Sequence, residues 1–458
     1  MKLKVQAKLD AGFAPMALVC REMREGTKEN GQDVVIAAER NKGYTTVYKT
    51  RIYKDGTGHD EENNAFIDRI AKTLLWVAGG YKLIIAGSEQ VGEYLRKTYC
   101  YGGTRDFDVR FMERVYEQTF EVIVTDLAHA PVDKSSAAPV GRHLDGCRIG
   151  FDAGGSDRKV SAVIDGETVY SEEVVWFPKL NSDPSYHYEG ILSAMKTAAS
   201  HMPRVDAIGV SSAGVYIDNK IMVASLFLKV NDEDFEKHVK NMYIDVAREI
   251  GENIPIEVAN DGDVTALAGA MSLNENGVLG IAMGTSEAAG YVDMDGNITG
   301  WLNELAFAPV DFNKDAMVDE WSGDYGCGVK YFSQDGVIKL APYAGIELDE
   351  SLSPAEKLKV VQNLMAEGDE RAKAIYETIG VYFGYTIAYY CEFYDIHEVL
   401  IMGRVTSGKG GEILLARAKE VLACEFPELN EKVTLNIPDE KARRVGQSVA
   451  AASLPKIG

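Results

Sequence analysis

The sequence predicts an α/β protein with more than one domain, and three observations carry this prediction. A chain of 458 residues is long enough for two or three domains of ordinary size. From about Cys147 onward, short apolar runs alternate with helical patterns, which is the order that builds sheets flanked by helices. Between Asp126 and Gly146 the sequence has two prolines, adjacent serines and no periodicity, which predicts a connector.

Composition and charge exclude several classes of protein. The chain has 70 acidic and 48 basic residues and a formal net charge of -22, a balance that repels nucleic-acid backbones and anionic membrane surfaces. The six cysteines have no paired or zinc-like spacing, which fits a reducing compartment. The first residues lack the apolar core of a secretory signal. The most apolar run, 378–391, is shorter than the ~20 residues that span a bilayer. We expect a core helix there, and a cytoplasmic protein with no nucleic-acid or membrane partner.

The N-terminal segment, residues 1–145, is expected to form an accessory α/β domain. A hairpin pattern at 34–49 is followed by a charged loop, a helical pattern and an apolar strand that ends in glycine,. The same order recurs at 148–214, with Glu39 aligned on Asp152. One hypothesis is that this segment is a degenerate repeat of the lobe that follows, without the glycines that phosphate binding needs. The alternative is an unrelated accessory domain.

The stretch GFDAGGSDRK, which begins at Gly150, has the residue types of a phosphate-binding hairpin. Glycines let the backbone approach a ligand closely and expose amide N–H groups. An aspartate at the end of the strand could hold the water shell of a Mg²⁺ ion. The alternative is an ordinary glycine hairpin with an aspartate at its edge. The candidates for phosphate and Mg²⁺ binding are Asp152, Gly154, Gly155, Ser156 and Lys159.

The second candidate segment is IEVANDGDVTALAGA, an apolar strand followed by a helix of small residues. An aspartate at a strand end can take the proton of a substrate hydroxyl as that hydroxyl attacks phosphorus. This chemistry makes Asp261 the candidate base. The alternative is that Asp261 or Asp263 caps the helix, and we expect that role for Asp263.

Two further glycine turns lie downstream. In GIAMGTSEAAGYVDMDG, Gly284, Thr285 and Ser286 follow an apolar strand and offer a second phosphate cradle, with an ordinary hairpin as the alternative. In EVLIMGRVTSGKGGEILLARAKEVL, a buried strand leads through a glycine-rich turn into a helix. Such a helix start can take a nucleotide base and ribose, although the turn lacks the spacing of a P-loop or a dinucleotide fingerprint.

The order of these four segments resembles that of the ROK family (repressor, open reading frame, kinase), from Cys147 to about Leu454. The resemblance implies a two-lobed actin-like ATPase/sugar kinase fold, which is ribonuclease H-like, behind the extra N-terminal α/β domain. The parts it implies are the accessory domain 1–145, a small lobe at 146–261 with the C-terminal helix 440–458, and a large lobe at 262–439.

The family's site motifs resemble short segments of this sequence, and each match implies a role for particular residues. Its opening Asp-x-Gly-Gly-Thr resembles DAGGS, and its catalytic Asn-Asp resembles ANDGD. The second match implies that Asp261 is the base and Asn260 a sugar ligand. Its second phosphate turn, Gly-Thr-Gly, resembles MGTS, with Ser286 in place of a glycine. Gly403 stands in the place of the family's glycine pair at the adenosine turn and Arg404 in the second position, which implies nucleotide binding there.

The sugar-binding and zinc-binding segments depart from the family. NELAF resembles the sugar-binding segment Gly-Glu-x-Gly-His and retains Glu304 as a substrate ligand. Phe307 replaces the histidine that touches both sugar and zinc in the family. Of three zinc cysteines, two are replaced by Glu320 and Ser322, and only Cys327 remains. One thiolate cannot make a zinc site of three or four ligands, so we expect no structural zinc and a buried thiol.

These observations predict an ATP-dependent kinase of a sugar or a sugar-like polyol, with ATP and Mg²⁺ as cofactors. The resemblance also implies a homodimer. A non-catalytic sugar-sensing protein of the same fold is one alternative, since the sugar segment has changed. Another alternative is an actin-fold kinase with a non-sugar acceptor. The DNA-binding branch of the family is disfavoured by the acidic charge and by the mixed α/β pattern of residues 1–145,.

Overall fold

The computed structural model describes residues 2–134, 140–438 and 440–457. Contacts divide the chain into two compact units, each built from separate stretches of sequence. Unit 1 comprises Met1–Ser136, Ile281–Ala289 and Gly300–Ile437, and unit 2 comprises Ala137–Gly280, Gly290–Thr299 and Pro438–Gly458. The N-terminal segment thus shares a compact unit with most of the chain after residue 300. The three-part division expected from the sequence stays a prediction.

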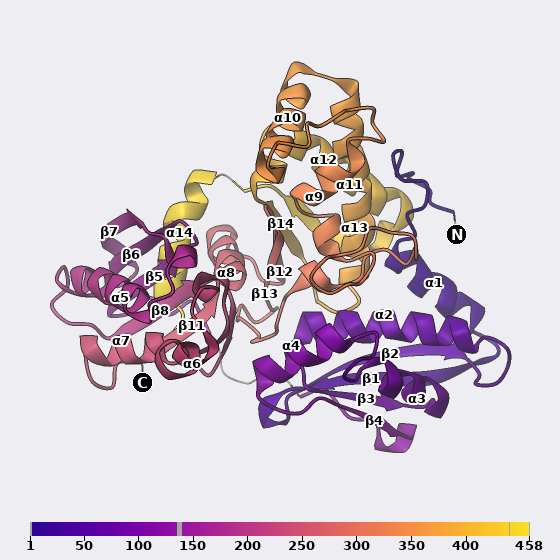
Figure 1. Ribbon diagram of the computed structural model, residues 1–458, viewed down its shortest axis with the longest axis horizontal. Helices are drawn as coiled ribbons and strands as arrows, with labels where there is room; N and C mark the ends of the chain where they lie inside the picture. Colours follow the sequence, from indigo (N-terminus) through magenta and orange to yellow (C-terminus); the bar gives the residue numbers. More distant parts are fainter. Residues whose placement is uncertain (1, 135–139, 439, 458) are drawn as a thin grey trace. The chain divides into compact units, whose positions relative to one another are not determined.

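The first part of unit 1 is a four-stranded sheet in the order β2-β1-β3-β4. Strands β1 and β2 form an antiparallel hairpin that pairs Gly31 with Tyr53 and Glu39 with Thr45. Figure 1 shows helix α2 running along one face of this sheet. The elements are α1 (Met16–Gly26), β1 (Gly31–Glu39), β2 (Thr45–Tyr53), α2 (Asp60–Ala78), β3 (Lys82–Ala86), α3 (Glu89–Thr98), α4 (Asp106–Tyr116) and β4 (Glu121–Thr125).

The hypothesis that this segment repeats the small lobe is wrong, because the strand directions differ. Strand β3 runs antiparallel to β1, whereas in unit 2 the matching strand β8 (Ala207–Ser212) runs parallel to β5 (Cys147–Ala153). Unit 2 has an additional antiparallel strand, β7 (Glu167–Val175), before its helix. That extra strand reverses the direction in which the chain re-enters the sheet. The N-terminal segment is therefore an accessory α/β layer of different topology.

A second four-stranded sheet, in the order β13-β12-β14-β15, lies mostly in unit 1. Helix α11 (Glu370–Tyr390) confirms the core helix expected at 378–391, since every one of its residues from Thr378 onward is buried. In the described part of the chain, no helix is long and apolar enough to cross a membrane. The other elements are β12 (Val278–Met283), β13 (Glu287–Val292), α9 (Gln334–Leu340), α10 (Pro354–Glu367), β14 (Glu398–Met402), α12 (Lys409–Glu425), α13 (Pro427–Lys432) and β15 (Thr434–Asn436).

Unit 2 is a five-stranded sheet in the order β11-β8-β5-β6-β7. Strands β11, β8 and β5 are parallel, and β6 and β7 continue from β5 as an antiparallel meander. Helices α5 and α7 contact the sheet within one apolar core, and α8 and α14 also contact its strands. The remaining bounds are β6 (Asp157–Ile164), α5 (Pro184–Ala199), β9 (Val215–Ile217), β10 (Lys220–Val223), α6 (Asp232–Asp234), α7 (Met242–Ile250), β11 (Ile256–Asn260), α8 (Asp261–Leu273) and α14 (Glu440–Ala452).

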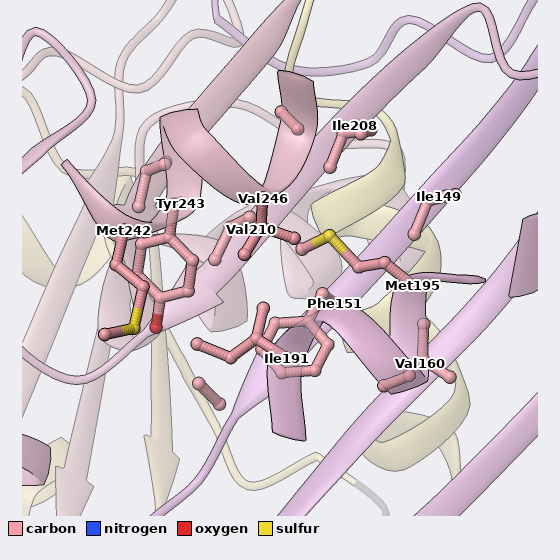
Figure 2. Packing of buried hydrophobic residues seen from close by; sticks show 14 of the residues in the cluster. Ile149, Phe151, Val160, Ile191, Met195, Ile208, Val210, Met242, Tyr243 and Val246 are labelled. Atoms are coloured by element: carbon pink, nitrogen blue, oxygen red, sulfur yellow. The ribbon is translucent and has the colours of Figure 1, made fainter. Parts of the chain in front are cut away.

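The two faces of strand β5 pack in different ways. On one face, Phe151 lies among the side chains of α5 and α7 in the apolar core (Figure 2). On the other, a Cβ on Gly150 would lie 2.1 Å from the backbone oxygen of Ser448, and one on Gly209 of β8 would lie 1.6 Å from that of Ala451. Because side chains alternate between the faces of a strand, these glycines let the backbone of α14 pack directly on the sheet.

A buried ion cluster joins the two parts of unit 1. The Asp324 carboxylate forms ion pairs with Lys72 of α2 and with Arg105, each at 2.7 Å. Arg69 of α2 pairs with the same carboxylate and stacks its guanidinium 3.7 Å from the centre of the Tyr325 ring. Although burial alone would raise it, the pKa of Asp324 lies well below its ordinary value because three cations surround the carboxylate. Asp68 pairs with Arg105, and Asp108 lies 3.7 Å from Lys72. Three cations thus meet three carboxylates.

The same cluster adjoins Cys327, the one cysteine that remains of the family's three zinc-binding cysteines. Cys327 is buried, as expected from the sequence, and is a free thiol. Burial raises its pKa to about 11, and the Lys72 ammonium lies 3.8 Å from its sulfur. Glu320, at the position of a family zinc cysteine, pairs with Lys330 instead. Within the described ranges, no group of three or more His, Cys, Asp or Glu side chains could hold a metal ion. The residues present therefore do not fit zinc.

Removing the shared carboxylate should destabilise unit 1. In Asp324→Asn, three buried cations would face two carboxylates, and an uncompensated buried charge costs about 3–5 kcal/mol. A urea titration followed by tryptophan fluorescence should show this loss in the free energy of unfolding. Asp315→Asn is the matched control because Asp315 is exposed nearby, and we expect it to stay within about 0.5 kcal/mol of the wild type. Equal midpoints for the two variants would contradict the role of the cluster.

Metal removal should leave the fold unchanged. The positive Lys72 ammonium beside the Cys327 sulfur would repel a metal cation, so we expect no stabilising ion for a chelator to remove. Elemental analysis of the purified protein should find no stoichiometric zinc, and its thermal midpoint should be the same with and without EDTA. A zinc content near one per chain, or a fall in the midpoint with EDTA, would refute the expectation.

Candidate functional site

The hairpin between β5 and β6 is held in a defined shape by one tryptophan. Trp176 is buried, and its indole N–H donates to the Gly154 carbonyl at 2.7 Å while its backbone N–H donates to the Ser156 carbonyl at 3.1 Å. Gly155 and Ser156 are exposed at the turn. The Lys179 side chain passes over Gly155, because a Cβ there would lie 3.1 Å from the Lys179 ammonium. The turn therefore offers exposed backbone next to a cation that the sequence analysis did not select.

Asp152 ends strand β5 beside this turn. The Ser211 hydroxyl donates to its carboxylate at 2.8 Å, and the Lys159 ammonium lies 3.9 Å away. Burial raises the pKa of Asp152 to about 6, against the opposing effects of Ser211 and Lys159, and the nearby charge of Asp261 raises it further. A carboxylate at a strand end fits the oxygen ligands and retained waters that Mg²⁺ prefers. Asp152 and Lys159 thus lie together as expected.

The Asn-Asp segment forms the junction of β11 and α8. Asn260 is the helix N-cap: its side-chain oxygen accepts from the Gly262 N–H at 2.8 Å, and its side-chain nitrogen donates to the Gly214 carbonyl at 2.7 Å. The expectation that Asp263 caps the helix is wrong. The Asp263 carboxylate accepts from the backbone N–H of Tyr291 at 3.0 Å, because asparagine already fills the cap position. Asn260 thereby fixes the first turn, where Asp261 begins.

Asp261 has the electrostatic setting of a proton acceptor. Burial raises its pKa, and the Gly262 N–H and the charge of Lys179 oppose that shift. It is half-buried and stands at the end of β11, two strands from Asp152 in the same sheet. Ligands of open α/β sheets bind outside the carboxyl ends of their parallel strands. The arrangement can therefore place a proton acceptor and a phosphate turn at one edge of unit 2.

The strand between these two aspartates supplies hydroxyl groups that the sequence analysis passed over. Ser211 and Ser212 end β8 and are fully buried. The Tyr243 hydroxyl of α7 donates to the Ser212 hydroxyl at 3.0 Å, and Figure 2 shows that hydroxyl at the edge of the apolar core. The adjacent serines at the end of an apolar run were the available signal. Ser211 holds the Asp152 carboxylate, and Ser212 joins the end of β8 to α7.

In unit 1, the two glycine turns that are expected to bind phosphate and nucleotide lie together. The Gly284 N–H donates to the Ser286 carbonyl at 3.0 Å, which closes the turn after β12. Arg404 donates from its guanidinium to the Thr285 hydroxyl at 3.1 Å. Gly403 has φ 97°, and a Cβ there would lie 2.3 Å from the Met283 carbonyl, so the close approach of β14 to β12 requires glycine,. Two segments more than a hundred residues apart thus form one candidate site.

The sugar segment is held by the end of helix α2. The last carbonyls of a helix have no intrahelical partner. Here the Val77 carbonyl accepts from the Asn303 N–H at 3.0 Å and the Trp76 carbonyl from the Glu304 N–H at 2.9 Å. Phe307 packs against Trp76 with ring centroids 4.4 Å apart. The N-terminal segment therefore positions the residues that differ most from the family pattern.

A buried glutamate that the sequence analysis missed lies behind this segment. Glu287 begins strand β13, is 3% exposed and has no hydrogen-bond partner for either carboxylate oxygen. Burial raises its pKa to about 8, and the neighbouring charge of Glu304 adds to the shift. A single carboxylate at the start of the otherwise apolar stretch EAAGYV was the only signal in the sequence.

The structure thus groups the predicted residues by unit. Unit 2 brings together the hairpin and strand-end residues: Asp152, Gly154, Gly155, Ser156, Lys159, Asn260 and Asp261. Unit 1 holds the remaining candidates: Gly284, Thr285, Ser286, Glu304, Gly403 and Arg404.

No family model and no curated protein matches this chain in sequence. Solved structures do match it in fold. A ROK family transcriptional regulator, a homologue of the E. coli MLC protein, aligns with 68% of this chain and 79% of its own at 18% identity and a TM-score of 0.51. A candidate sugar kinase from Cytophaga hutchinsonii aligns with 66% of this chain and 98% of its own at 17% identity and a TM-score of 0.50. The ROK hexokinase from Thermus thermophilus aligns with 67% and 97% at 18% identity and a TM-score of 0.49.

Identities this low show the fold and leave the activity open. The resemblance drawn from the sequence is confirmed at that level, and both a regulator and a kinase share the architecture. Over about two-thirds of its length, the chain has the actin-like α/β fold of ROK family proteins.

Proposed function

We propose that this protein is an ATP-dependent kinase that transfers the γ-phosphoryl group to a hydroxyl of a sugar or sugar-like polyol. The observation that carries the proposal is the placement of Asp152 and Asp261 at the carboxyl ends of β5 and β11 in one sheet, beside the exposed glycine turn at Gly155. ATP and Mg²⁺ as cofactors, a homodimer and a cytoplasmic location belong to this proposal through the resemblance to the family.

In the proposed reaction, each group in unit 2 has a separate task. Asp261 accepts the proton of the acceptor hydroxyl as its oxygen attacks the γ-phosphorus, and its raised pKa makes it a stronger proton acceptor than an ordinary aspartate,. The exposed amides of the Gly155 turn, with Lys159 and Lys179, stabilise the negative charge of the phosphates. Asp152 would hold Mg²⁺ through water, and that ion supplies further charge neutralisation when bound.

In unit 1, the turn at Gly284–Ser286 and the turn at Gly403 and Arg404 are assigned to the nucleotide, because their backbones approach each other closely. Glu304 is assigned to the acceptor as a substrate ligand. Phe307 offers an aromatic face in the same segment, and such faces commonly pack on the apolar side of a sugar ring.

A non-catalytic sugar sensor of the same fold is the second candidate. It is favoured by the structural match to a ROK transcriptional regulator and by the changed segment at Asn303 to Phe307. A screen of ATP consumption against sugars, polyols and carboxylates separates the candidates. Turnover with a sugar or polyol supports the proposal, turnover with a carboxylate indicates an acyl-phosphate-forming kinase, and sugar binding without turnover indicates the sensor.

Replacing the base should stop the chemistry and spare nucleotide binding. Asp261→Asn keeps the shape but removes the proton acceptor, and such groups contribute about 10²–10⁴-fold to rate. We expect kcat to fall by that factor, with an unchanged ATP dissociation constant by calorimetry. Because burial raises the pKa of Asp261, wild-type kcat/KM should decline with falling pH earlier than an ordinary aspartate would require. Turnover of the variant at close to the wild-type kcat would contradict the mechanism.

The cation over the glycine turn should contribute to nucleotide affinity. Lys179→Met keeps the length of the side chain and removes the charge beside Gly155, so we expect KM for ATP to rise roughly fivefold, as for an exposed ion pair worth about 1 kcal/mol. Lys196→Met on α5 is the control, because Lys196 is also an exposed lysine of unit 2. Steady-state kinetics in low salt would test this, and equal KM values for both variants would contradict it.

A further inference from the structure

The buried glutamate Glu287 is the feature that the proposed reaction leaves unused. Both of its carboxylate oxygens are buried without a hydrogen-bond partner. A Cβ on Gly328 would lie 2.3 Å from the Glu287 Oε2 atom and 2.6 Å from the Leu305 carbonyl. The carboxylate therefore lies against Gly328, which also adjoins the backbone of Leu305, the residue that follows Glu304. Glycine at 328 leaves the room that this approach needs.

The surroundings of Glu287 supply negative charge and a hydroxyl. The charge of Glu304 adds to the rise in the pKa of Glu287, and the charge of Glu287 adds to the rise in the pKa of the buried Tyr390 on α11. The Tyr390 hydroxyl is also buried without a hydrogen-bond partner. Three buried oxygens in these two side chains thus have unused hydrogen-bonding capacity. Buried polar groups are rarely left in this state, so each calls for an explanation.

A neutral ligand would satisfy this arrangement poorly. A sugar hydroxyl can donate one hydrogen bond and leaves the repulsion between the two glutamates in place. A protonated amine donates three hydrogen bonds and offsets one negative charge. Hydrogen bonds between an ammonium and a carboxylate are also about twice as strong as those between neutral groups. The orphaned oxygens and the paired charges therefore both favour a cationic group.

We propose that Glu287 and Glu304 form a recognition site for a protonated amine on the phosphate acceptor, so that the acceptor is an amino sugar or an amino polyol. This inference rests on the proposed function, because it places the acceptor at Glu304. Glu304, which is partly exposed, contacts the amine, and Glu287 behind it supplies the second carboxylate. On binding, the ammonium replaces the proton that Glu287 carries in the free protein.

Proton release follows from this exchange. Burial and the charge of Glu304 keep Glu287 mostly protonated at neutral pH, since its pKa is about 8. When the ammonium binds, the Glu287 carboxyl loses its proton to the buffer, and no covalent bond of the acceptor changes. An acceptor with a hydroxyl or an acetylated amine in the same place carries no charge, so its binding releases no proton.

The test is calorimetric and needs no turnover. Hexosamines and glucamine are titrated into the full-length protein in parallel with the matching neutral hexoses, N-acetylhexosamines and sorbitol, in buffers of different ionisation enthalpy. For the wild type we expect the best amine probe to bind about ten- to a hundredfold tighter than its neutral counterparts, with release of a proton near neutral pH. Glu287→Gln, which keeps the shape, should lose the preference and the proton release.

Glu257→Gln is the matched control. Glu257 lies on β11 in unit 2, and burial also raises its pKa, to about 7, so this variant removes a comparable carboxyl that does not adjoin Glu304. It should keep the amine preference of the wild type. Equal affinity of wild type for amine and neutral probes, failure of every amine probe to bind, or an unchanged preference in Glu287→Gln would each overturn the proposal.

A stability measurement shows that Glu287→Gln is folded and reports on the same carboxyl. The pKa of Glu287 is raised on folding from 4.5 to about 8, so the stability it contributes is full below the lower value and is lost as pH rises to and through the upper one. The wild-type thermal midpoint should fall over this range more than that of Glu287→Gln. Parallel profiles would overturn the assignment of a buried, unpaired carboxyl.

The test of the amine site can succeed or fail independently of the test of the proposed function. Amine binding with no ATP consumption would leave the recognition site standing and refute the kinase. Phosphorylation of neutral sugars at the same kcat/KM as their amino counterparts would leave the kinase standing and refute the amine site.

Discussion

The organisation of unit 1 depends on the shared carboxylate of Asp324. It lies in a loop after residue 300, and its three cationic partners come from the N-terminal segment. A carboxylate taken out of water in this way is stable only where its partners are fixed by other packing. Helix α2 supplies that packing with its buried apolar residues. Carbonyl groups at the end of the same helix accept hydrogen bonds from the backbone N–H groups of Asn303 and Glu304. The N-terminal segment is therefore part of the framework that holds the sugar segment.

In both units, closely packed backbone positions the candidate functional residues. In unit 2, glycines at 150 and 209 bring α14 onto the sheet that ends in Asp152, and the indole of Trp176 fixes the hairpin turn. In unit 1, Gly403 allows two turns to meet. The carboxyls of Asp152, Asp261 and Glu287 in these units have raised pKa values, with burial as the leading cause. Carboxyls with perturbed pKa values on a rigid frame are characteristic of functional sites.

The local features of this chain could be predicted from its sequence. The glycine hairpin at Gly154, the Asn-Asp strand end and the core helix at 378–391 all depend on residues a few positions apart, whose spacing reports directly on structure. The cluster at Asp324 could not be predicted, because its partners are more than two hundred residues away and look like ordinary positions of a charged helix. The repeat hypothesis failed because similarity at a hairpin says nothing of the direction of the next strand. Glu287 could not be predicted as a functional residue, because a single carboxyl in an apolar stretch forms no recognisable sequence motif.

The close packing of α14 also orders events during synthesis. Its backbone covers the glycine face of β5 and β8, yet between those strands and α14 the chain runs through the whole second part of unit 1. Domains fold as their sequence leaves the ribosome, so the sheet of unit 2 emerges long before the helix that covers it. Until then a bare strip of glycine backbone and apolar edge is open to solvent. Unit 2 is thus the last unit to complete its packing, and a nascent chain of this protein is most exposed to chaperones and proteases at that sheet.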